Sequence, residues 1–196
     1  MPTPWLKRIR DTGQLTVFNK GGMWADSVNA AITTFNTLPF DVEFVAAKDE
    51  KSANVVVILA HGPQKYEREG NTIDTGGFRF DQFQGVTYTL KDTSLNAIFF
   101  AAIFLPGKLP KPAKGQKEVM IVHEFIHACG VPEHETTPDG GIMYDIMVPS
   151  NGGLQEGSKK GKPMPPIRVG PQTLSRVESV WLSSQNYAAW LQRPDI

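Results

Sequence analysis

The sequence lacks several features that would by themselves assign it to a class of protein. It has one cysteine, Cys129, and so neither a disulfide framework nor a cysteine cluster for a structural metal. Its 20 basic and 20 acidic residues cancel, which favours neither nucleic acid nor an anionic membrane as the main partner. No apolar run is long enough to span a membrane, and no apolar signal-peptide region follows MPTPWLKRIR at residues 1–10. We therefore expect no membrane span and no signal peptide in this chain.

The patterning predicts one domain in which strands and helices are mixed. The 196 residues suffice for a sizeable core, and they contain no repeat and no second core-sized unit. Short apolar or alternating runs predict strands, and apolar residues at helical spacing predict helices. The expected strands are 14–19, 41–47, 53–60, 86–90 and 96–106. The expected helices are 23–40, 117–130 and 173–191, and the expected long loops are 62–85 and 149–172.

The most informative stretch is VMIVHEFIHACGVPEHE at residues 119–135, which contains three of the four histidines. On a helix, His123 and His127 are one turn apart on the same face, a spacing at which two imidazoles can bind one zinc ion. Glu124 lies about 100° around the helix from His123, which suits a base that accepts a proton from water rather than a direct ligand. Val119, Val122, Ile126 and Cys129 form the stripe expected to face the core.

The stretch continues in a way that offers a third ligand. Gly130 stands where a helix needs a left-handed residue to end, so the chain can turn back beneath the two histidines. Glu133 and His134 follow three and four residues later. We favour His134, because neutral imidazole suits zinc, but a carboxylate ligand is also acceptable and Glu133 remains the alternative.

Together these residues resemble the metzincin signature, H-E-x-x-H-x-x-G with a third ligand and a methionine turn, here Met143 and Tyr144 of GGIMYD. Within that family the chain is most similar to matrixin-type catalytic domains. WADSVNAAITTFNTLPFDVEFV, SANVVVIL, AAIFLPG, HEFIHACG, GIMYD and LSRVESVW follow one another as their counterparts do there. The likeness is strong over 119–148 and weak over most of 24–191. A buried helix with two hydrogen-bonded histidines and a surface glutamate is the structural alternative.

The resemblance implies an α+β, zincin-like fold: a twisted, mixed, mostly parallel sheet with two packed helices and an active-site cleft. A single catalytic domain would comprise an N-terminal lobe of about 1–130 and a small C-terminal lobe of about 131–196 that ends in a helix. The strand near 97–104 would form the sheet edge over the cleft, where an extended peptide can pair as an additional strand. The resemblance suggests a secreted protein, but this chain shows no signal peptide and its localisation stays open. We expect a monomer.

The function that follows is that of a zinc endopeptidase acting on protein or peptide substrates. His123, His127 and His134 would hold one zinc ion, and Glu124 would act as the general base. Met143 would form an apolar floor under the metal, a role for which Met147 is a poorer match. The alternative is a non-catalytic, metal-stabilised binding protein on the same scaffold. Glu124 favours catalysis, because a structural site needs no base and more often has a fourth protein ligand.

Two further sites can be considered. The resemblance places Tyr144, Ile146, Val148 and Pro149 around the pocket for the residue after the scissile bond. Such an apolar lining predicts cleavage before apolar residues and a penalty for charged ones at that position of the substrate.

Asp74 and Asp81 could lie near a calcium ion, but acidic, glycine-rich loops are more often solvated, and we favour that interpretation. His61 has no partner histidine nearby, so no second zinc site is expected.

Overall fold

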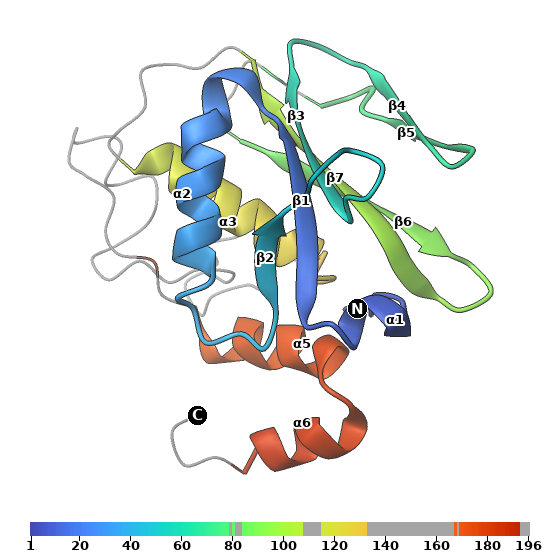
Figure 1. The fold of residues 1–196 in the computed structure, drawn as a ribbon, viewed down its shortest axis with the longest axis vertical. Coiled ribbons are helices and arrows are strands. Elements are labelled where there is room, and N and C mark those ends of the chain that lie inside the picture. The colour runs from blue at the N-terminus through green and yellow to red at the C-terminus, as the bar shows by residue number, and fades with distance from the viewer. Residues whose placement is uncertain (79, 81–83, 108–114, 133–166, 168, 193–196) are drawn as a thin grey trace.

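The computed structural model describes residues 1–78, 80, 84–107, 115–132, 167 and 169–192, which form a mixed α/β structure (Figure 1). Its elements are α1 (Lys7–Arg10), β1 (Gln14–Lys20), η1 (Gly22–Trp24), α2 (Ala25–Phe35), β2 (Glu43–Ala46), β3 (Val55–Ala60), β4 (Lys65–Arg68), β5 (Asn71–Asp74), β6 (Val86–Asp92), β7 (Ala97–Pro106), α3 (Gln116–Ala128), α5 (Pro171–Trp181) and α6 (Ser184–Trp190).

A five-stranded sheet in the order β2-β1-β3-β7-β6 is the centre of the structure. The first four strands in that order are parallel, and β6 is antiparallel to β7. The expectation of a mostly parallel sheet is therefore confirmed. The expectation that residues 97–104 form the edge is wrong, because β7 pairs with β3 on one side and β6 on the other. The edge strand next to β7 is β6, and the uninterrupted apolar sequence of β7 is that of a strand covered on both faces.

Helices α2 and α3 pack side by side on one face of the sheet and enclose the larger core (Figure 1). Phe44 of β2 stacks on Phe125 of α3 with ring centroids 4.2 Å apart, and Phe35 of α2 meets Phe44 edge to face at 4.6 Å. The Thr34 hydroxyl of α2 donates a hydrogen bond to the Glu118 carboxylate of α3. These contacts fix the position of α3 against the sheet.

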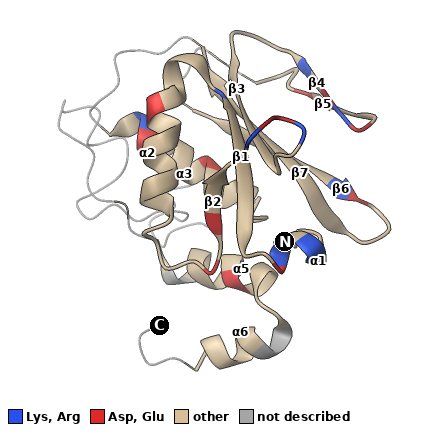
Figure 2. Cartoon of the chain, in the orientation of Figure 1, with Lys and Arg blue, Asp and Glu red and all other residues tan. Residues whose placement is uncertain are grey.

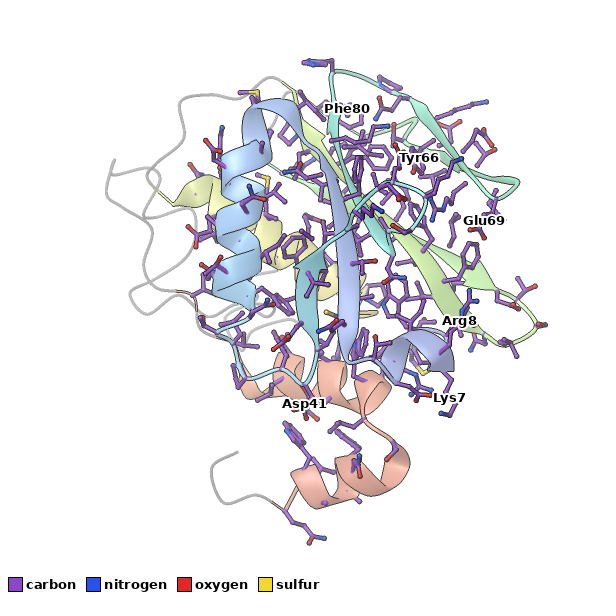
Figure 3. The ribbon with its side chains drawn as sticks, viewed as in Figure 1. Lys7, Arg8, Asp41, Tyr66, Glu69 and Phe80 are labelled. Carbon is purple, nitrogen blue, oxygen red and sulfur yellow. The ribbon has the colours of Figure 1, made fainter. Side chains whose placement is uncertain are left out.

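The opposite face of the sheet is covered by a β4–β5 hairpin, where the sequence predicted only a loop over 62–85. Its two-residue turn has positive φ at both Glu69 (49°) and Gly70 (76°), as in a type I′ turn. Tyr66 stacks on Phe100 of β7 at 5.7 Å, and Phe80 belongs to the same second core (Figure 3). Each strand of the hairpin has four residues with one apolar side chain, Tyr66 in β4 and Ile73 in β5, which is too few to show an alternating pattern in the sequence.

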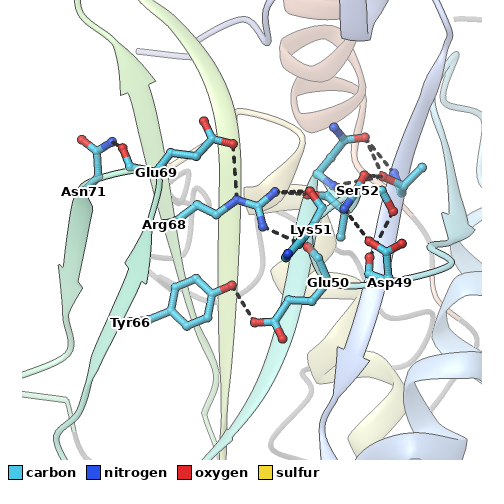
Figure 4. A network of polar contacts seen from close by, with 11 residues as sticks. Asp49, Glu50, Lys51, Ser52, Tyr66, Arg68, Glu69 and Asn71 are labelled. Atoms are coloured by element: carbon cyan, nitrogen blue, oxygen red, sulfur yellow. Dashed lines mark hydrogen bonds and ion pairs between the residues drawn. The ribbon is translucent and has the colours of Figure 1, made fainter.

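Arg68 fastens this hairpin to the loop between β2 and β3 (Figure 4). Its guanidinium donates hydrogen bonds to the carbonyls of Glu50, Lys51 and Ala53 at 2.9, 2.8 and 3.1 Å. The same group lies 4.7 Å from the centre of the Phe100 ring. One side chain thus joins the hairpin to both the loop and the sheet.

The C-terminal segment forms two helices where one was expected over 173–191. Leu182 is extended (ψ 150°), and the Ser183 side chain accepts a hydrogen bond from the Asn186 amide to begin α6. Val177 and Trp181 of α5 belong to the larger core, so α5 packs against the N-terminal part of the domain. Residues 133–166, which include most of the expected C-terminal lobe, lie outside the described residues.

Charged residues of both signs are distributed over the described elements, with basic residues in α1 and both signs in the hairpin (Figure 2). The central strands β3 and β7 have none. Among the helices that the structure describes, none is long and apolar enough to cross a membrane.

Candidate metal centre and its neighbours

Helix α3 presents the histidine motif from a buried position. It begins after Gly115 (φ 81°), and the predicted inward stripe of Val119, Val122, Ile126 and Cys129 is buried as expected. The neighbouring face is also enclosed, because His123 and Glu124 are only 6% and 3% exposed. The helix is therefore covered on more sides than its sequence pattern indicated.

The two histidines of the motif face each other. Their Nε2 atoms are 3.1 Å apart, and their rings meet edge to face with centroids 4.7 Å apart. Two nitrogen ligands of one tetrahedral zinc, each at about 2.0–2.1 Å, lie about 3.3–3.4 Å apart. The observed separation fits that requirement within a few tenths of an ångström, so His123 and His127 suit a shared zinc ion.

The orientation of His127 is set by its other ring nitrogen. Nδ1 lies 2.7 Å from the carbonyl oxygen of Val131, which can only accept a hydrogen bond. Nδ1 therefore carries the proton, and the lone pair of Nε2 is directed towards His123. A hydrogen bond of this kind, from a ligating histidine to a backbone carbonyl, is typical of metal sites.

Gly130 makes this arrangement possible. Its φ is +107°, so the left-handed end of the helix predicted at this residue is present. A Cβ atom here would lie 2.2 Å from the carbonyl oxygen of Thr3. Only glycine satisfies both the backbone angle and the close approach of the N-terminal segment.

Glu124 points towards the start of the edge strand β6. The hydroxyl of Thr87 donates a hydrogen bond to Glu124 Oε2 at 2.7 Å, and Gly85 lies against the same carboxyl group. Burial raises the pKa of Glu124 to about 7, and the hydrogen bond from Thr87 partly opposes that shift. The structural alternative requires a surface glutamate, whereas this one is almost completely buried.

Thr87 and Gly85 are neighbours of the site that the sequence did not reveal. VTYTL at 86–90 predicted a strand, but nothing in the sequence indicated that this strand would lie beside α3. The alternation offers a partial signal. Val86, Tyr88 and Leu90 pack in the second core, so Thr87 belongs to the opposite, helix-covered face.

Several predicted site residues lie outside the described residues, and the structure does not test them. They are Glu133, His134, Met143, Tyr144, Ile146, Met147, Val148, Pro149 and Asp81. Within the residues that are described, no group of three or more His, Cys, Asp or Glu side chains could hold a metal ion. The structure thus brings together two of the three predicted ligands and leaves the third untested.

The remaining candidates are separate from the two histidines. Asp74 lies on β5 of the hairpin, with Oδ2 4.0 Å from Lys65 Nζ, and is mostly exposed. Cys129 is fully buried in the larger core, and burial raises the pKa of its thiol well above the usual value. The expected place of Cys129 in the core-facing stripe of the helix is confirmed.

No protein-family model matches the sequence, and no curated protein is significantly similar to it.

Proposed function

We propose that the protein is a zinc-dependent endopeptidase with a metzincin-like, matrixin-type catalytic domain. The observation that carries the proposal is the arrangement on one helix of two facing imidazoles and a buried carboxyl group. The Nε2 atoms of His123 and His127 are 3.1 Å apart, and Glu124 is beside them at the sheet edge. His134 is the third ligand that we favour, with Glu133 as the alternative.

In the proposed reaction zinc and Glu124 have different roles. When bound, zinc supplies Lewis-acid polarisation of a carbonyl group and makes water more acidic. Glu124 accepts the proton of the attacking water, whose oxygen bonds to the carbonyl carbon of the substrate. As the carbon–nitrogen bond breaks, Glu124 passes that proton to the departing amine. Burial favours this role, because it raises the pKa of the Glu124 carboxyl group in the zinc-free chain and so makes a proton easier for it to accept.

The sheet edge suggests how a peptide would bind. Strand β6 pairs with β7 on one side, and on its other side no strand is present within the described part of the chain. An extended peptide that pairs with this edge uses main-chain hydrogen bonds, which tolerate many side chains. The start of β6 lies beside Glu124, so the peptide bond to be cleaved would reach the base there. This assigns to β6 the role that the sequence had suggested for 97–104.

A combined metal and cleavage measurement on the purified chain tests the proposal. We expect one zinc ion per chain and internal cleavage of a peptide library that stops on chelation and returns with zinc. Stoichiometric zinc without cleavage would favour the non-catalytic binding protein. A chain that binds no zinc would contradict both functions.

A further inference from the structure

We infer that Thr87 and Gly85, at the start of the edge strand, are positioning residues that orient the carboxyl group of Glu124. The catalytic consequence of this inference rests on the proposed function. The contacts that orient the carboxyl group, however, are present in the zinc-free chain and can be tested there. It assigns a role to two residues outside the metal-binding motif.

Thr87 takes one of the two carboxyl oxygens. Its Oγ1 lies 2.7 Å from Glu124 Oε2 and 3.2 Å from the main-chain carbonyl of the same residue. A hydroxyl has one proton to donate, and the shorter contact is the better hydrogen bond. No other hydrogen bond to this carboxyl group is present among the described residues. Oε1 therefore remains as the acceptor for a water molecule.

Gly85 provides the space that this orientation needs. A Cβ atom at residue 85 would lie 2.7 Å from Cγ, 2.8 Å from Oε1 and 2.9 Å from Cδ of Glu124. Real Cβ atoms do not approach other atoms so closely, so any side chain here must displace the carboxyl group. Thr87 attracts one oxygen, while the bare backbone of Gly85 borders the other.

The sheet holds Thr87 in place. Thr87 pairs with Ile103 of β7, and the neighbouring Val86 pairs with Phe104. Both partners are fully buried, so the register of β6 is fixed by the core rather than by the site. The strand proposed to pair with the substrate is thus also the strand that orients the base. We expect disturbance of this contact to lower kcat rather than raise KM.

Thr87→Val removes the hydroxyl at nearly constant volume, and Thr87→Ser keeps it. We expect kcat for peptide hydrolysis to fall by at least about tenfold in Thr87→Val, with KM changed less than about twofold, and to recover largely in Thr87→Ser. Gly85→Ala should lower kcat in the same way. The matched control is Thr16→Val, which removes a half-buried hydroxyl of β1 that donates to Asn54 at 2.9 Å and not to a residue of α3.

Crystal structures of the zinc-free wild type, Thr87→Val and Thr87→Ser provide a readout that needs no activity. We expect the Glu124 carboxyl group to move in Thr87→Val and to stay in place in Thr87→Ser. An unmoved carboxyl group in Thr87→Val, or an unchanged kcat, would overturn the inference. A moved carboxyl group in a chain that cleaves no peptide would support the positioning role and contradict the proposed function.

Discussion

The indole Nε1–H of Trp5 donates a hydrogen bond to the carbonyl oxygen of Ala128 at 2.8 Å, across 123 positions of the chain. The next carbonyl, that of Cys129, accepts a hydrogen bond from the Trp181 indole at 2.9 Å. The one after that, of Gly130, accepts from the backbone amide of Thr3 at 2.8 Å.

With the carbonyl of Val131 bound to His127, four consecutive carbonyls at 128–131 are satisfied by groups outside the helical pattern. The end of α3, after which the proposed third ligand would follow, is therefore fixed by the N-terminal segment, by α5 and by His127 itself. Helix ends need such external partners, because their last carbonyls have none within the helix.

Trp5→Phe tests this anchoring. The substitution keeps a ring in the core but leaves the buried carbonyl of Ala128 without its donor, so we expect a loss of about 1–3 kcal/mol in the free energy of unfolding. Denaturant unfolding of wild type and variant measures it. Trp190→Phe is the control, because Trp190 is also buried and its indole has no hydrogen bond to any of the residues that the structure describes. Equal losses in the two variants would show that the hydrogen bond does not matter.

The metal ligands are tested by replacing each histidine. His123→Ala and His127→Ala should each reduce bound zinc from one ion per chain towards zero, because two ligands do not retain zinc as three do. Metal analysis after dialysis measures the stoichiometry. The control is His61→Ala, because His61 is the one histidine outside the motif. This variant should keep one zinc ion per chain.

His134→Ala and Glu133→Ala distinguish the two candidates for the third ligand. Only the loss of the true ligand should weaken zinc binding by orders of magnitude. Full zinc retention in a His123→Ala, His127→Ala double variant would refute the assignment of the metal site to α3.

The hairpin contact is tested at Arg68. Arg68→Met removes donors from three carbonyls, and we expect a loss of about 2 kcal/mol or more in stability, with faster amide exchange over residues 65–74. Arg68→Lys should not restore it, since one ammonium cannot replace a planar fork that reaches three acceptors and lies on Phe100. Arg8→Met, at an exposed residue of α1, is the control (Figure 3). Unchanged exchange in the hairpin of Arg68→Met would contradict the role of this contact.

Local patterns predicted the parts of the fold in which one segment determines its own structure. The heptad-like spacing of Val119, Val122 and Ile126 predicted α3, and Gly130 predicted its end. The prediction of a single helix over 173–191 is wrong, because the apolar spacing continues across the break between α5 and α6, where the Ser183 cap begins a second helix.

Long-range neighbours were not predictable in the same way. The order of β6 and β7 in the sheet depends on pairing between strands, and both have sequences that suit a strand. The same limit applies to the site. The spacing of the two histidines could be predicted from the sequence, but the contact of Thr87 with Glu124 could not, because it depends on β6 lying beside α3.

The central claim is that Glu124 acts as the base of a zinc peptidase, and Glu124→Gln tests it most directly. The amide has nearly the size of the carboxyl group and still accepts from Thr87, but it cannot take a proton from water. We expect the variant to keep one zinc ion and its stability, while kcat for peptide hydrolysis falls by a factor of about 10² or more. Glu118→Gln on the same helix should retain activity. Hydrolysis by zinc-loaded Glu124→Gln at the wild-type rate would contradict the account.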